Sequence, residues 1–226
     1  MVLTKKRAIV AESPRPAKTD DAGRAPGPLE GATFVTGAAV RAQLPPAGPP
    51  EIAFAGRSNV GKSSAINALA RRTRLAHASR TPGRTQQINF FRLRSGALVA
   101  DLPGYGYAAV PRALKASWQD FLWDYVRTRD PLIGLVLVVD ARHGLKSLDL
   151  DLLTAFLPSG RPVLVLATKS DKLNASERRA AVTGIADALR TVFPEHAKTA
   201  SVVGFSVSTG QGVVEANETL AQWLGA

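Results

Sequence analysis

Eight consecutive residues have the types and the spacing that bind phosphate groups. They are Gly56, Arg57, Ser58, Asn59, Val60, Gly61, Lys62 and Ser63, and we call them the phosphate turn. Glycines let the chain curl until successive N–H groups point into one concavity. A helix that begins near Lys62 adds its own unpaired N–H groups. Lys62 can then reach the β- and γ-phosphates of a nucleotide, and the Ser63 hydroxyl can ligate Mg²⁺. The alternative is a glycine-rich turn without a ligand.

Two further stretches offer groups to the phosphates and to a metal ion. Asp101 follows an apolar segment and is placed to hold Mg²⁺ directly or through water, and the Gly104 amide can meet a γ-phosphate. Residues 73–87 form a polar, basic segment that is long for a loop, and such loops are usually functional. Thr85 within it carries a hydroxyl that can reach Mg²⁺.

Two stretches near the C-terminal half offer groups that suit guanine. Asp171 comes shortly after the apolar segment 163–167, and a carboxylate there can accept hydrogen bonds from N1–H and the exocyclic amine of guanine. Adenine offers neither pattern. The aliphatic stem of Lys169 can cover the base, and the backbone of Ser206 and Val207 can meet the guanine O6 atom. Each stretch alone is weak evidence, but their order along the chain is specific.

The elements that must position these groups alternate between strands and helices. Strands are predicted at 51–55, 88–94, 97–101, 132–140, 162–168 and 199–204, and helices at 63–72, 112–129, 147–157, 176–193 and 213–224. Such alternation predicts an α/β fold with a mostly parallel sheet and right-handed crossovers. Ligands of such sheets bind at the carboxyl ends of the strands.

The chain divides into three predicted parts. Residues 1–30 are rich in Pro, Gly, Ala and charge and predict a disordered basic tail. Residues 31–50 form an N-terminal arm with a proline-rich connector, and segment 31–40 is either a short edge strand or a packed arm. Residues 51–226 form the nucleotide-binding domain.

Composition excludes several classes of site. The 226 residues include no cysteine, which rules out disulfides and thiolate metal sites. No apolar run approaches the ~20 residues of a membrane span, and the start lacks the apolar region of a secretory signal. We therefore expect a cytoplasmic protein.

The charge balance points to a polyanionic partner. The formal net charge is +11, which favours nucleic acid. No acidic residue lies between Glu51 and Asp101, and the arginines outside the motifs have no acidic partner nearby in sequence. The alternative is a solvated basic face. The basic residues of this span are Arg57, Lys62, Arg71, Arg72, Arg74, Arg80, Arg84, Arg92 and Arg94.

The motifs together resemble one family. The stretches AFAGRSNVGKSS (53–64), TPGRTQQINFF (81–91), DLPGYGYA (101–108) and ATKSDKL (167–173) are similar to those of the EngB (YihA/YsxC) family of bacterial ribosome-biogenesis GTPases, within the translation-factor-related class. The resemblance implies a three-layer P-loop GTPase fold, with a mostly parallel six-stranded sheet, one antiparallel edge strand and helices on both faces. It also implies assembly of the large ribosomal subunit and, through it, normal cell division and septation.

The resemblance also assigns site residues. Ser63 and Thr85 would ligate Mg²⁺. Besides the phosphate turn, the nucleotide would be lined by Gly83, Arg84, Thr85, Gln86, Gln87, Asp101, Leu102, Pro103, Gly104, Thr168, Lys169, Ser170, Asp171, Phe205, Ser206 and Val207. At Val207 the family often carries a smaller residue, so only its backbone is expected to matter.

Hydrolysis of GTP is expected to be slow and to involve Lys62, Thr85, Gly104 and Asn59. Tyr105 occupies the place where many switch GTPases carry a glutamine that orients water. Asn59 matches a position where related GTPases hold K⁺, or it is simply a residue tolerated in a tight turn. Tyr105 and Tyr107 either pack internally or stack on a ribosomal base.

The expected cofactors are GTP or GDP and Mg²⁺, and the expected partners are the large-subunit precursor and ribosomal RNA. We expect a monomer that binds neither DNA nor membranes. With GTP bound, Thr85 and Gly104 are drawn to the metal and the γ-phosphate, and hydrolysis releases both loops. Two rivals stay open. One is a P-loop ATPase or kinase, against which Asp171 argues, and the other is a GTPase that acts on a protein or a membrane.

Overall fold

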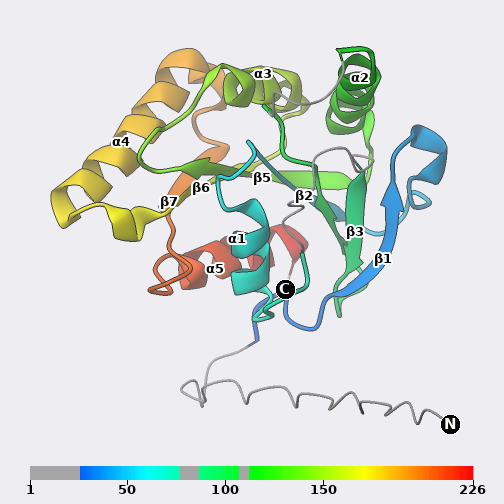
Figure 1. Ribbon diagram of the computed structural model, residues 1–226, viewed down its shortest axis with the longest axis horizontal. Coiled ribbons are helices and arrows are strands. Elements are labelled where there is room, and N and C mark those ends of the chain that lie inside the picture. The colour runs from blue at the N-terminus through cyan, green and yellow to red at the C-terminus, as the bar shows by residue number, and fades with distance from the viewer. Residues whose placement is uncertain (1–25, 77–86, 107–111, 226) are drawn as a thin grey trace, which may run out of the picture.

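The computed structural model describes residues 26–76, 87–106 and 112–225. Within these residues the chain builds one sheet of seven strands with helices on both faces (Figure 1). The strands are β1 (Thr33–Ala38), β2 (Glu51–Gly56), β3 (Ile88–Arg92), β4 (Leu98–Asp101), β5 (Leu132–Asp140), β6 (Val163–Thr168) and β7 (Ala200–Gly204). Their spatial order is β1-β3-β4-β2-β5-β6-β7.

The predicted fold class is confirmed, with seven strands in place of six. Strand β3 runs antiparallel to both of its neighbours, β1 and β4, whereas the pairs from β4 to β7 are parallel. The extra strand is β1, which pairs with β3 from Thr33↔Arg92 to Ala38↔Ile88. Of the two alternatives for segment 31–40, the edge strand is correct. The antiparallel strand β3 is thereby covered and is not itself the edge.

Five helices cover the sheet in the described residues. They are α1 (Lys62–Leu69), α2 (Arg112–Thr128), α3 (Ser147–Phe156), α4 (Ala175–Val192) and α5 (Val213–Leu224). One core cluster packs α2, α3 and α4 on one face, and a second packs α1 and α5 on the other, as Figure 1 shows. Short 3-10 turns lie at Arg41–Gln43, Leu157–Ser159, Ser170–Lys172 and Pro194–His196. No helix of the described residues is both long and apolar enough to cross a membrane.

Part of the segment predicted as a tail packs against the domain. Leu29 is fully buried in the core beside α1 and α5, and Glu30 forms an ion pair with Arg71 at 3.1 Å. Residues 26–30 therefore belong to the packed domain, because Leu29 covers apolar side chains of that core. The rest of the predicted tail, residues 1–25, lies outside the described residues.

A buried carboxylate anchors the amino end of the central strand. Glu51 is the first residue of β2 and is 0% exposed. It accepts a hydrogen bond of 2.8 Å from the hydroxyl of Tyr125 on α2 and one of 3.0 Å from Nε of Arg129, the residue after that helix. Arg129 also donates to the carbonyl oxygen of Pro45 at 2.8 Å. The network thus ties the connector, β2 and α2 together at the edge opposite to the predicted motifs.

Replacing Arg129 with methionine should lower stability strongly. Arg129→Met leaves the buried Glu51 carboxylate without its counter-charge, and breaking a buried ion pair costs about 3–5 kcal/mol. Arg127→Met removes an exposed arginine two residues earlier, in α2, and should change the free energy of unfolding by no more than about 0.5 kcal/mol. Urea unfolding of both variants measures the difference, and equal stabilities would show that the buried pair is dispensable.

Candidate functional site

The phosphate turn has the geometry that its sequence predicts. It leads from β2 into α1, and Gly61 precedes the helix with a φ of 99° that only glycine adopts readily. Gly56 is needed for a different reason, since a Cβ atom there would stand 2.5 Å from the carbonyl oxygen of Val138. Lys62 and Ser63 occupy the first turn of α1. The turn and the unpaired N–H groups of the helix start can therefore face one anion.

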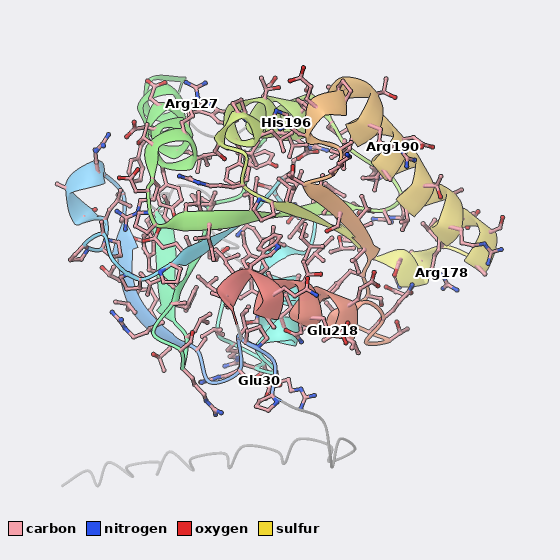
Figure 2. The ribbon with its side chains drawn as sticks, turned by 180° about the vertical axis from the view of Figure 1, so that it is seen from behind. Glu30, Arg127, Arg178, Arg190, His196 and Glu218 are labelled. Carbon is pink, nitrogen blue, oxygen red and sulfur yellow. The ribbon has the colours of Figure 1, made fainter. Side chains whose placement is uncertain are left out.

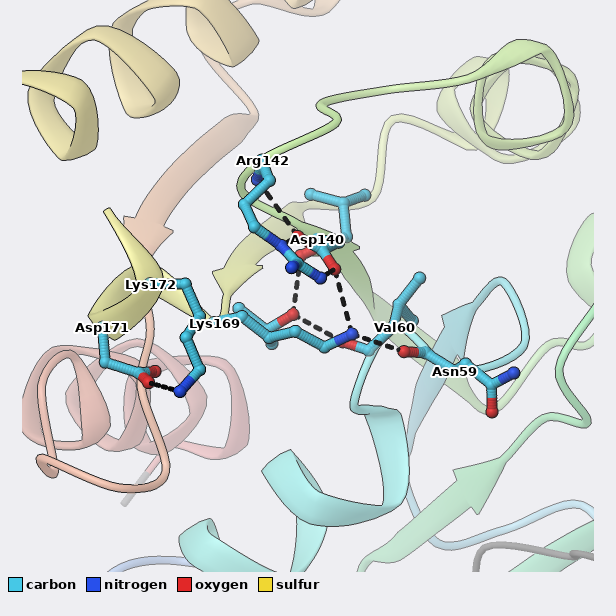
Figure 3. A network of polar contacts seen from close by, with 9 residues as sticks. Asn59, Val60, Asp140, Arg142, Lys169, Asp171 and Lys172 are labelled. Carbon is cyan, nitrogen blue, oxygen red and sulfur yellow. Dashed lines mark hydrogen bonds and ion pairs between the residues drawn. The ribbon is translucent and has the colours of Figure 1, made fainter. Parts of the chain in front are cut away.

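Residues at the carboxyl end of β6, Thr168 and Lys169, hold the backbone of the phosphate turn in place. The Thr168 hydroxyl lies 2.5 Å from the Val60 carbonyl oxygen and 2.8 Å from that of Val139. Lys169 Nζ donates to the Asn59 carbonyl oxygen at 2.8 Å, as Figure 3 shows. These bonds fix the carbonyls of Asn59 and Val60, whereas the N–H groups of Ser58 and Val60 donate to the carbonyl oxygens of Tyr105 and Arg57.

Lys169 is itself fixed by a carboxylate that sequence reasoning missed. Asp140, the last residue of β5, forms an ion pair with Lys169 at 2.9 Å and accepts hydrogen bonds from Arg142 at 2.9 and 2.7 Å (Figure 3). Burial alone would raise the pKa of Asp140, but the hydrogen bonds from Arg142 and Lys169 outweigh it and hold that pKa well below its usual value. The sequence does carry a signal for Asp140: it is an aspartate at the end of an apolar run, and that run ends at the same edge of the sheet as the other motifs.

The Asp101–Gly104 turn lies directly against the phosphate turn. Asp101 ends β4 beside β2, and its carboxylate forms an ion pair with Lys62. Both side chains are nearly buried, at 5% and 10% exposed. The Ser58 hydroxyl donates to the Gly104 carbonyl oxygen at 3.3 Å. Two motifs that lie far apart in the sequence therefore meet at one point.

The two predicted guanine motifs also meet. The Ser206 hydroxyl donates to Asp171 Oδ1 at 2.8 Å, and Ser170 N–H donates to the Phe205 carbonyl oxygen at 3.2 Å. The hydrogen bond from Ser206 is the main cause that lowers the pKa of Asp171, with Lys172 adding to it against a smaller opposing effect of burial. The carboxylate is therefore kept ionised, as an acceptor of two hydrogen bonds must be.

Some predicted site residues support the site from within. The side chains of Leu102 and Phe205 are fully buried in the two cores, and Thr168 is 3% exposed with its hydroxyl engaged. Only the backbone of Leu102 and Phe205 can meet a ligand. Val207 is 50% exposed, and its predicted backbone contact to guanine stays a prediction. The Gln87 side chain donates to Asn89 at 2.9 Å.

The structure decides between the two roles considered for Tyr105. Its ring is buried, at 7% exposed, and its hydroxyl donates to Asp149 at 2.7 Å. It packs internally, so stacking on a ribosomal base is the wrong alternative for this residue. Tyr107, Gly83, Arg84, Thr85 and Gln86 lie outside the described residues, and their predicted roles stay predictions.

Comparisons with known proteins agree with this geometry. A family model described as 50S ribosome-binding GTPase matches residues 51–169. A probable GTP-binding protein EngB from Azoarcus sp. is 51% identical over 181 residues, which are 80% of this chain and 85% of that protein. The chain belongs to the EngB family.

Two other EngB proteins are similar to this chain, one in sequence and one in fold. The probable GTP-binding protein EngB of Neisseria meningitidis serogroup B is 51% identical over 178 residues, 79% of this chain and 84% of that protein. A crystal structure of a probable EngB protein superposes with a TM-score of 0.61 over 77% of this chain and 98% of that chain. At 21% identity that match supports the fold alone. The predicted family and the predicted enzyme class, a GTPase, are confirmed.

The Asp140 network predicts a specific pH dependence of stability. Because the pKa of Asp140 in the folded EngB-family protein lies below its unfolded value of about 3.9, the ionised carboxylate stabilises the fold above about pH 4. This contribution is lost as the pH falls through the folded-state pKa. We therefore expect Asp140→Asn to be less stable than wild type at pH 6, and the gap to narrow as the pH falls from about 5 to about 2.

Urea unfolding over a pH series measures the gap. Asp151→Asn, which changes an exposed aspartate of α3, should show only a small difference from wild type across the series. A gap for Asp140→Asn that keeps the same size throughout would contradict the assigned role of its charge.

Proposed function

We propose that this EngB-family protein is a Mg²⁺-dependent guanine-nucleotide switch with slow intrinsic hydrolysis, which acts in assembly of the large ribosomal subunit and is needed for normal cell division and septation. The observation that carries the proposal is the convergence of its motifs. The phosphate turn, the Asp101–Gly104 turn and the Asp171–Ser206 pair all lie at the carboxyl ends of neighbouring strands, where nucleotides bind in sheets of this kind.

Different residues of the chain would contact the phosphates and the base of the nucleotide. The N–H groups of the phosphate turn and the Lys62 ammonium would hold the phosphates. The Asp171 carboxylate would accept from the guanine edge, and Lys169 would cover the base with its stem. Lys169 and Thr168 already hold the phosphate turn, so one loop serves the base and the phosphates together.

The donor set fits Mg²⁺. The Ser63 hydroxyl at the helix start and the Asp101 carboxylate, which is paired with Lys62, are hard oxygen donors of the type that Mg²⁺ prefers. Thr85 is the further proposed ligand. A bound Mg²⁺ would supply positive charge to the phosphate oxygens, and the role of the protein is to present these oxygens beside the turn.

Slow hydrolysis follows from the residue after Gly104. Tyr105 has no side-chain amide, and its hydroxyl is already bonded to Asp149, so it does not orient water as the glutamine of many switch GTPases does. A K⁺ ion held at Asn59 would supply positive charge that the site otherwise takes from Lys62 and Mg²⁺. Asn59 has a φ of 66°, and in Figure 3 its amide extends away from the Asp140–Lys169 network.

Ribosomal RNA is the proposed partner because of where the positive charge lies. Arg72, Arg74, Arg92 and Arg94 are exposed and flank the segment that carries Thr85. Arg71 also belongs to this span, and it pairs with Glu30, a residue distant in sequence. The family description, 50S ribosome-binding GTPase, agrees with a partner in the large subunit. In this role the protein is a cytoplasmic monomer.

The alternative is a GTPase switch that acts on a protein or a membrane. Sedimentation of cell extract with a non-hydrolysable GTP analogue separates the two, because an RNA partner makes co-sedimentation with ribosomal particles sensitive to ribonuclease. Association that survives ribonuclease would favour the alternative.

Guanine selectivity is expected to depend on Asp171. Asp171→Asn turns one acceptor into a donor, so GTP affinity should fall by about 5- to 150-fold, the effect of leaving a polar edge unpaired. Affinity for xanthosine triphosphate should rise. Calorimetric titration measures both, with Asp187→Asn on the exposed surface of α4 as control. Unchanged GTP affinity would sink the guanine assignment.

Ribosome binding is expected to depend on the exposed arginines Arg72, Arg74, Arg92 and Arg94, which we call the basic face. Replacing Arg72 and Arg74 with glutamine should weaken co-sedimentation with large-subunit particles and flatten its salt dependence by roughly one unit of slope per lost phosphate contact. GTP binding should be retained, since neither residue lies in a nucleotide motif.

The matched control removes two arginines elsewhere. Arg179 and Arg190 are exposed on α4, where Figure 2 labels Arg190. Changing both to glutamine alters the net charge equally. If both double variants lose the same affinity for large-subunit particles, the effect is one of net charge. The basic face is then not the contact.

A further inference from the structure

A hydrogen bond outside the nucleotide motifs joins the Asp101–Gly104 turn to α3. The Tyr105 hydroxyl donates to Asp149 Oδ1 at 2.7 Å, and both groups are buried, at 7% and 1% exposed. Tyr105 comes directly after Gly104, whose amide is the proposed contact to the γ-phosphate. The hydroxyl therefore fixes the chain one residue beyond that amide.

Asp149 is a rigid anchor because its own helix holds it. It lies in the first turn of α3, where its Oδ2 atom accepts from the N–H of Lys146 at 2.9 Å. Burial is the largest influence on the carboxyl and raises the pKa of Asp149, although the bonds from Tyr105 and Lys146 and the charge of Arg57 oppose it. One carboxylate oxygen is bonded to the Tyr105 hydroxyl and the other to the N–H of Lys146 at the start of α3, so the side chain is fixed relative to both.

The main chain of the same residue is bound to the phosphate turn. Ser58 N–H donates to the Tyr105 carbonyl oxygen at 2.9 Å, and Arg57 and Tyr105 form an isolated parallel bridge. Gly104 lies so close to Ser58 that an added Cβ atom would stand 3.1–3.2 Å from it. Tyr105 is thus held at its backbone by the phosphate turn and at its hydroxyl by α3.

We propose that Asp149 is a positioning residue for the nucleotide switch, acting through the Tyr105 hydroxyl to set where the Gly104 amide stands against the phosphate turn. The inference rests on the proposed function, since it concerns discrimination between GTP and GDP at that site. GDP has no γ-phosphate for Gly104 to meet. Loss of the anchor therefore reduces affinity for the triphosphate form and spares the diphosphate form.

The test compares affinities for GDP and a non-hydrolysable GTP analogue by calorimetry in the full chain. Tyr105→Phe keeps the ring and removes the hydroxyl. We expect the ratio of GTP-analogue affinity to GDP affinity to fall about three- to tenfold, the effect of one hydrogen bond, with GDP affinity within about twofold of wild type.

The chain offers a closely matched control. Tyr125 is the other buried tyrosine of the described residues whose hydroxyl donates to a buried carboxylate, Glu51, at 2.8 Å. It lies at the opposite edge of the sheet. Tyr125→Phe loses a bond of the same kind and should leave the affinity ratio unchanged, so the pair of variants separates positioning from general stability.

Two Asp149 variants test the anchor itself. Asp149→Leu should lower the ratio as Tyr105→Phe does, and the double variant should fall no further, because both changes remove one interaction. Asp149→Asn should recover most of the ratio, since a hydroxyl can donate to or accept from an amide.

The outcomes distinguish this inference from the function beneath it. Wild-type protein that binds neither nucleotide overturns both. Normal wild-type binding with the same ratio in Tyr105→Phe and Tyr125→Phe overturns the positioning role alone. Additive losses in the double variant would also overturn it, since they would show that the two residues act separately.

Discussion

The candidate site depends on the groups that donate hydrogen bonds to the carbonyl oxygens of the phosphate turn. A turn that points its N–H groups inwards must point its carbonyls elsewhere, and a buried carbonyl without a donor is costly. Here Thr168 and Lys169 supply the donors for Val60 and Asn59. Asp140 in turn holds the Lys169 ammonium. The loop that meets the base is thereby also the brace of the phosphate cradle, so the two halves of a nucleotide site are positioned by one another.

Charges at the two edges of the sheet do different work. At the amino edge Glu51 is enclosed by Arg129 and Tyr125, far from any predicted ligand contact. At the carboxyl edge Lys62 and Asp101 are paired but belong to groups that phosphate and metal also attract. Both pairs are nearly buried, and a buried pair is retained only where its geometry satisfies both partners. The first pair secures the fold, and the second lies where ligand chemistry is expected.

Most of the architecture could be predicted because it is written in local patterns. The buried strands are continuous apolar runs, as at Leu132–Asp140, and the long helices carry an apolar face. The phosphate turn is eight adjacent residues whose backbone needs follow from their types. The sequence does not decide whether segment 31–40 is a strand, because the apolar residues Phe34 and Val35 are adjacent and break the alternation of a half-buried strand. Its identity comes from pairing with β3.

The nucleotide motifs, their order and the α/β alternation follow from the sequence, since each is set by residues that are neighbours in the chain. Which distant groups serve these motifs depends on the tertiary structure. Tyr105 meets Asp149 across 44 residues, and Lys169 meets Asn59 across 110. Arg71 forms an ion pair with Glu30, and Leu29 is buried in the core, although the sequence around them is polar and irregular. Side-chain partners are fixed by where parallel strands end in space, and that information is absent from any short stretch of the chain.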